Sequence, residues 1–80
     1  MRNPVAMGAI VTEFIQEEVA WRQWSMKRFA AEMQASERLA ESIHDGKSNV
    51  SELLFHRLSR AFGTSAAVWR NLQKGQNVAK

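Results

Sequence analysis

The sequence predicts an all-α protein of five short helices. Apolar residues recur at intervals of three and four in five separate stretches, which is the spacing of one face of an α-helix. Serine precedes several of these stretches and glycine follows several, as expected for residues that begin and end helices. Of the 80 residues, 45% are hydrophobic and 24% are charged, a balance typical of one globular domain. We therefore expect a single domain over residues 1–80.

The first helix is expected over residues 8–21. Ile10, Phe14 and Trp21 share one side of that helix and are predicted to face the core. The glutamates of the same segment are predicted to face water.

Residues 25–44 predict two short amphipathic helices separated by a brief turn. Ser25 can cap a helix over 26–33, and Ser36 can cap a helix over 37–44. The side chains expected to face inward are Met26, Phe29, Ala30 and Met33 from the first helix, and Leu39, Ala40 and Ile43 from the second. Gly46, within Asp45-Gly46-Lys47, is expected to end the second helix with a positive φ. This outline is that of a helix-turn-helix, in which the outer face of the second helix is free to enter a DNA major groove.

Two further helices are expected to complete the domain. The fourth starts after the cap Ser51 and stops at Gly63, and its inward residues are Leu54, Leu58, Ala61 and Phe62. The fifth starts after Thr64 or Ser65 and ends near Gly75, and its apolar side consists of Val68, Trp69 and Leu72. Trp69 and Leu72 are candidates for a dimer interface, because a terminal helix can offer one side to a second copy. Burial of both within the monomer is the equally weighted alternative.

Charge is unevenly distributed along the chain. Residues 1–52 contain six basic and eight acidic side chains, a net charge of −2, whereas residues 53–80 contain five basic side chains and no acidic one. A basic segment can attract phosphate, but it can equally be a solvated surface or an interface for an acidic partner. The chain has no cysteine, which excludes disulfides and thiolate metal sites and is compatible with a cytoplasmic protein. We expect no metal, no cofactor and no membrane segment.

One group of residues has the composition of a catalytic triad. Ser42, His44 and Asp45 lie close together in sequence, but a triad requires the histidine to bridge the other two beside an oxyanion pocket. Adjacent positions at one helix end are poorly placed for that geometry, so we expect no enzymatic activity here.

The second motif helix carries the expected DNA site. The side chains expected to contact base edges are Glu37, Arg38, Glu41 and Ser42. Those expected to contact phosphates are Ser25, Lys27 and Arg28 at the start of the first motif helix, and Lys47, Ser48 and Asn49 after the second. Arginine can bind guanine through both arms and glutamate can accept from cytosine, whereas the two glutamates repel phosphate. A solvated helix without DNA affinity is the alternative interpretation.

Further motifs surround this unit. They are Asn3-Pro4-Val5 near the start, Phe62-Gly63-Thr64-Ser65, and Trp69-Arg70-Asn71-Leu72-Gln73. Together with the helix-turn-helix outline, these motifs resemble those of HigA-type antitoxins of the XRE, or λ-repressor-like, family. The resemblance covers nearly the whole chain. Among the departures, Gln34 stands where the family commonly has the glycine of the turn, and Glu37 stands where arginine is frequent.

The resemblance implies a five-helix λ-repressor-like domain that binds double-stranded DNA. It further implies a homodimeric transcriptional repressor of a palindromic operator in its own promoter, paired with a RelE-like toxin. The alternative left open is a protein-interaction module that neutralises a toxin or another partner, with weak or no DNA binding.

Overall fold

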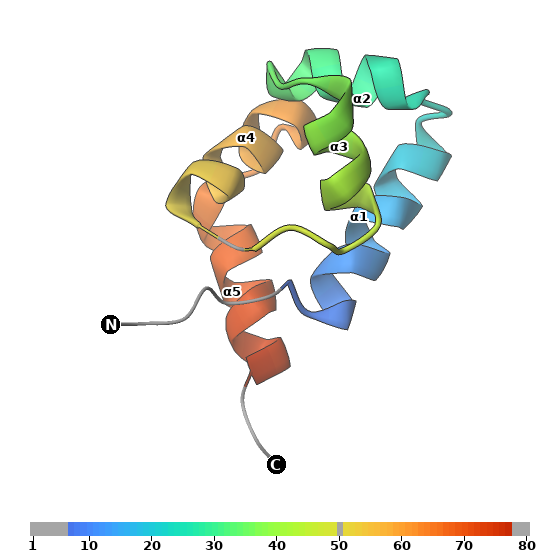
Figure 1. Cartoon of the computed structure of the whole chain (residues 1–80). Helices are drawn as coiled ribbons and strands as arrows, with labels where there is room; N and C mark the ends of the chain where they lie inside the picture. Colours follow the sequence, from blue (N-terminus) through green and yellow to red (C-terminus); the bar gives the residue numbers. More distant parts are fainter. Residues whose placement is uncertain (1–6, 50, 78–80) are drawn as a thin grey trace.

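The computed structural model describes residues 7–49 and 51–77, and within them the fold consists of five α-helices (Figure 1). Their bounds are α1 Ala9–Trp21, α2 Met26–Met33, α3 Glu37–His44, α4 Glu52–Phe62 and α5 Ala66–Asn77. The all-α prediction is confirmed, and the predicted bounds agree to within about one turn or better. The Asn3-Pro4-Val5 motif lies outside the described residues.

Serine side chains begin three of the helices, as predicted. The Oγ atoms of Ser25, Ser36 and Ser51 accept hydrogen bonds from the backbone N–H three residues later, at 3.0, 3.1 and 3.1 Å. Each bond satisfies one of the backbone donors that a helix N-terminus leaves without an internal partner.

Four helices are followed, within two residues of their last residue, by a residue in the left-handed conformation. These residues and their φ angles are Gln23 at 57°, Gln34 at 56°, Gly46 at 74° and Gly63 at 71°. The φ > 0 expected at Gly46 is confirmed. The two glutamines adopt a conformation that costs an L-residue with a side chain roughly 1–2 kcal/mol. The ends of α1 and α2 are therefore strained where glycine would be relaxed.

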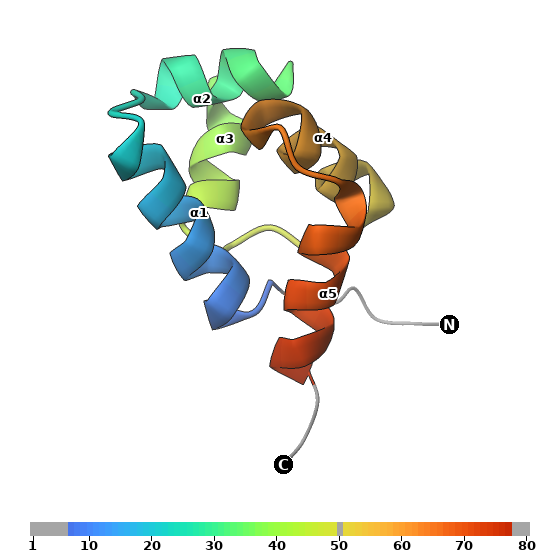
Figure 2. The ribbon, with the colours of Figure 1, turned by 180° about the vertical axis from the view of Figure 1, so that it is seen from behind.

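The core lies between all five helices. In Figure 1, α3 stands in front, whereas α1 and α5 stand in front when the molecule is seen from behind in Figure 2. Trp69 of α5 is fully buried at the centre, with its ring 5.2 Å from Phe14 and 5.5 Å from Phe62. Trp24 stacks on Phe62 at 5.6 Å. These rings join α1, α4 and α5 into one apolar cluster.

The inward face predicted for α1 is wrong. The buried residues are Val11, Ile15 and Val19, whereas the side chain of Trp21 is 83% exposed and that of Ile10 is 47% exposed. Phe14 from the predicted set is half-buried and packs on the core. The helix AIVTEFIQEEVAW has apolar residues on two sides, so helical spacing alone does not select one. The packing of α5 and α3 against α1 determines which side of α1 is buried.

A buried polar contact joins α5 to the start of α1. Gln73 of α5 is 4% exposed, and its Oε1 accepts a 2.9 Å hydrogen bond from the backbone N–H of Gly8, the residue that caps α1. A side chain 65 positions away thus serves the start of α1, where the glycine itself has no side chain to offer.

Candidate nucleic-acid interface

The candidate interface is built on α2 and α3, which are joined by residues 34–36. Phe29, Ala30 and Met33 of α2 are buried, as are Ala40 and Ile43 of α3. The inward faces predicted for both helices are confirmed, with Met26 and Leu39 partly buried at the edge of the core. The two helices therefore share one core, and the other side of α3 faces solvent.

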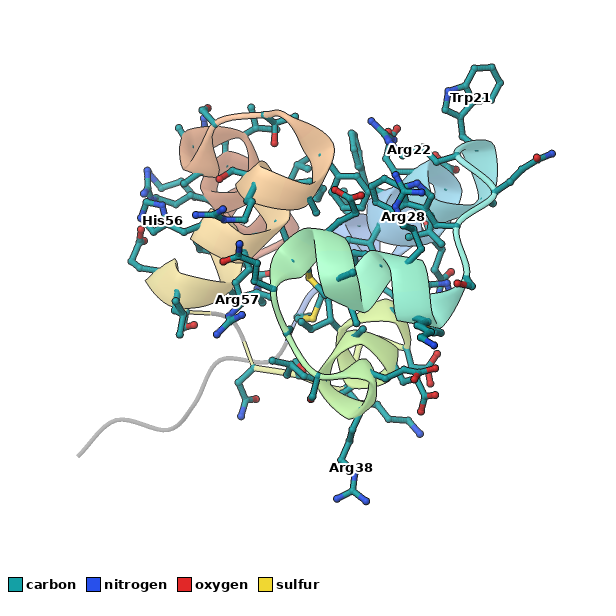
Figure 3. All side chains as sticks on the ribbon, turned by 90° about the horizontal axis from the view of Figure 1, so that it is seen from above. Trp21, Arg22, Arg28, Arg38, His56 and Arg57 are labelled. Carbon is teal, nitrogen blue, oxygen red and sulfur yellow. The ribbon has the colours of Figure 1, made fainter. Side chains whose placement is uncertain are left out.

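Three of the four expected base-contacting residues lie on this solvent side. Glu37, Arg38 and Glu41 are exposed, and Arg38 projects away from the body of the molecule (Figure 3). Within the part of the chain that the structure describes, Arg38 makes no hydrogen bond or ion pair. Its guanidinium is available to bind an acceptor.

Ser42 is placed differently from the other three. Its side chain is partly buried, and its Oγ lies 3.0 Å from the Oγ of Ser48 in the loop that follows α3. The backbone carbonyl of Ser48 also accepts a 3.3 Å hydrogen bond from the N–H of Met7. Ser42 and Ser48 thus hold the loop against α3, and neither side chain points freely outward.

The expected phosphate contacts are not all brought together. Lys27, Lys47 and Asn49 are exposed. Arg28 instead forms a 2.6 Å hydrogen-bonded ion pair with Glu32 and lies over the Trp24 ring at 5.5 Å. Figure 3 shows Arg28 on the side of α2 away from Arg38. Its charge is therefore partly compensated and directed away from the outer face of α3.

The Oγ of Ser25 acts as the helix cap. It accepts the N–H of Arg28, and a phosphate at this end of α2 would meet the remaining free amides of the first turn. The Ser25 hydroxyl keeps its own O–H, so this end offers both the amides and that hydroxyl as donors.

Arg22 and Arg57 were not singled out from the sequence. Arg22 pairs with Glu18 and lies over the rings of Trp24 and Phe62, at 5.4 and 5.0 Å. Arg57 of α4 donates from Nη1 to two backbone carbonyls, that of Met33 at 3.1 Å and that of Gln34 at 2.7 Å. The backbone at Gln34 is left-handed, and this conformation is not evident from a glutamine in the sequence.

Trp69 does not form an exposed association face. The alternative of burial within the monomer holds for its indole, whose Nε1 donates to the Thr64 hydroxyl at 2.7 Å. Leu72 is partly buried against the same core. A second chain cannot reach Trp69 in this conformation.

The residues of the candidate triad are not arranged as one. The Oγ of Ser42 faces Ser48, whereas Nδ1 of His44 lies 3.3 Å from a carboxylate oxygen of Asp45. Across residues 7–49 and 51–77, no three His, Cys, Asp or Glu side chains are grouped so that they could hold a metal ion. None of the helices described is long and apolar enough to cross a membrane.

No protein-family model matches the chain, and no curated protein matches it significantly.

Proposed function

We propose that the protein is a sequence-specific DNA-binding regulator in which α2 and α3 act as a helix-turn-helix and α3 enters the major groove. The observation that carries the proposal is the two-sided character of α3. Ala40 and Ile43 are buried on one side, whereas Arg38 projects freely and Glu37 and Glu41 are exposed on the other. A polar helix face that stands clear of the body is what the major groove accepts.

The outer residues of α3 suit base edges better than phosphates. A free guanidinium can donate to O6 and N7 of guanine, and a carboxylate can accept from N4 of cytosine. Glu37 and Glu41 repel the phosphate backbone, so α3 adds little non-specific attraction. Lys27 and Lys47, which lie on the segments flanking α3, are the exposed cations proposed to contact phosphates.

The resemblance to HigA-type antitoxins supports a repressor role on a palindromic operator. Two copies on such an operator would place their α3 helices about 34–36 Å apart, which is one turn of duplex. Pairing with a RelE-like toxin is the corresponding expectation for a protein partner.

The experiment first selects bound sequences from random duplex DNA and then measures affinity for the selected and a scrambled duplex. Arg38→Ala should weaken binding to the selected duplex by about 1–3 kcal/mol and relax the preference at one base pair. Lys27→Ala, the matched control, should weaken both duplexes alike and lower the salt dependence.

Two outcomes would count against the proposal. Equal loss on both duplexes for Arg38→Ala would show that α3 does not read sequence. Absence of any duplex binding would favour the interaction-module alternative, in which the protein acts on another protein.

A further inference from the structure

The turn between α2 and α3 is held by a contact from a third helix. At the end of α2, the N–H of Gln34 donates to the carbonyl of Ala31 at 3.1 Å, and the N–H of Ala35 donates to that of Ala30 at 2.9 Å. This pair of bonds is the Schellman arrangement, which normally places glycine at the left-handed position. Here the position is occupied by Gln34.

Arg57 satisfies the next two carbonyls in the same turn. Its Nη1 reaches Met33 O and Gln34 O from α4, more than 20 positions along the chain. A guanidinium that bridges two successive carbonyls fixes the direction in which the backbone leaves α2, because both carbonyls must point toward one group. Since only residues 34–36 separate α2 from α3, that direction also sets the course of α3.

The end of α1 provides an internal comparison. Gln23 has the same left-handed conformation, and the N–H groups of Gln23 and Trp24 form the same two backbone bonds, to Ala20 and Val19. No arginine bridges the carbonyls there within the described residues. The guanidinium contact is therefore specific to the α2–α3 turn and is not a general consequence of a left-handed glutamine.

The surface around the Arg57 side chain is hollowed and not closely packed. Two surface hollows border Arg57, one of about 590 Å³ between the end of α2 and α4, and one of about 200 Å³ between α3 and α4. Arg57 and Leu53 line both, and the side chain of Leu53 is 62% exposed. Figure 3 shows Arg57 directed from α4 toward the end of α2. Beside these hollows, the hydrogen bonds from Arg57 connect α4 to the turn between α2 and α3.

We infer that Arg57 is a positioning residue for α3: its bridge to the carbonyls of Met33 and Gln34 holds the left-handed turn and thereby sets the angle at which α3 is presented. The effect on DNA rests on the proposed function, whereas the effect on the turn does not. Arg57 acts through the turn and need not touch DNA.

The central variant is Arg57→Met, which keeps a long apolar stem and removes the guanidinium. Arg60→Met is the matched control, because Arg60 lies one turn further on α4, is exposed and makes no hydrogen bond within the described part of the chain. Arg57→Met should lower affinity for the selected duplex at least about tenfold, the loss expected for a charged hydrogen bond, and should reduce the ratio of selected to scrambled affinity. Arg60→Met should leave that ratio unchanged.

Glycine substitutions test the link to the strained turn. Gln34→Gly should restore much of the discrimination lost in Arg57→Met, because glycine adopts the left-handed conformation without the guanidinium. Gln23→Gly, which relieves the same conformation at the end of α1, should not restore it. Equal effects of the two glycine variants, or an equal loss for Arg57→Met and Arg60→Met, would overturn the inference.

Hydrogen exchange supplies a measurement that needs no DNA. In Arg57→Met, the amides of Gln34 and Ala35 should exchange faster than in the wild type, while those of Gln23 and Trp24 should not change. Unchanged exchange at Gln34 and Ala35 would overturn the inference whatever the DNA result. Faster exchange without any duplex binding by the wild type would support the role of Arg57 in the turn and reject the proposed function alone.

Discussion

Gly46 and Gly63 end α3 and α4 with similar backbone angles but very different surroundings. Their φ angles are 74° and 71°. A Cβ added to Gly46 would lie 2.6 Å from Oγ1 of Thr12 on α1, whereas a Cβ on Gly63 would meet nothing within 4 Å. Gly46 therefore serves two purposes at once: it adopts the left-handed turn and allows α1 to approach the end of α3.

Alanine at each glycine should separate these two purposes. Gly63→Ala should cost about 1–2 kcal/mol, since only the left-handed conformation is penalised. Gly46→Ala should cost about a further 1–3 kcal/mol, because Thr12 and the backbone around it must also shift. Urea unfolding measures both values. Equal losses for the two variants would contradict the close approach of Thr12, and Thr12→Ala combined with Gly46→Ala should recover part of the larger loss.

Among the helices, α3 and α1 differ in how firmly sequence orients them. α3 has apolar residues on one side only, and that side is buried as predicted. α1 has them on two sides, and the predicted side is the more exposed one. Amphipathic spacing orients a helix when one of its sides is polar. When both sides are apolar, the neighbouring helices decide.

The packing of α3 can be tested at Ile43, which is 1% exposed. Ile43→Ala should destabilise the protein by about 2–5 kcal/mol, through lost burial and the cavity that remains. Leu53→Ala on α4 is the control, because the Leu53 side chain is 62% exposed and its loss should cost less than about 0.5 kcal/mol. Thermal or urea unfolding gives the comparison. A small effect of Ile43→Ala would mean that α3 does not pack on the core by this face.

α5 connects the other parts of the fold. Trp69 fills the centre, Gln73 caps the start of α1, and Arg70 binds Glu52 at the start of α4 through two hydrogen bonds of 2.7 and 3.0 Å. The hydrogen bond from Arg70 is the main reason that the pKa of Glu52 lies below its usual value of 4.5. The same pairing raises the pKa of Arg70.

This ion pair should make stability depend on pH in one direction. Because the pKa of Glu52 is lower in the folded protein than in the unfolded chain, the pair stabilises the fold above pH 4.5, and the contribution is lost as pH falls through the lowered pKa. The Tm of the wild type should therefore exceed that of Glu52→Gln at pH 7, by a small margin because the pair is exposed, and the difference should close in acid.

Glu13→Gln is the control, since it removes an exposed carboxylate on α1 that forms no ion pair within the described residues. A gap between wild type and Glu52→Gln that stays constant from pH 7 to below pH 4 would contradict the assignment of the pair.

The local features of this protein could be predicted from residue type and spacing. The five helices, the serine caps, the left-handed Gly46 and the outer face of α3 all depend on residues within a few positions of one another. Caps, turns and one-sided amphipathic faces are decided over such short distances, so residue type and spacing are sufficient to predict them.

The features that join distant segments depend on how the helices pack and could not be predicted in this way. These are the buried side of α1, the burial of Trp69, and the bridge from Arg57 to the α2–α3 turn. In each case the sequence pattern allows the side chain to be either buried or exposed, or either bonded or free. Which of these occurs depends on the helix that packs against it. The physical reason is that burial and hydrogen bonding between segments more than 20 positions apart depend on the arrangement of all five helices together.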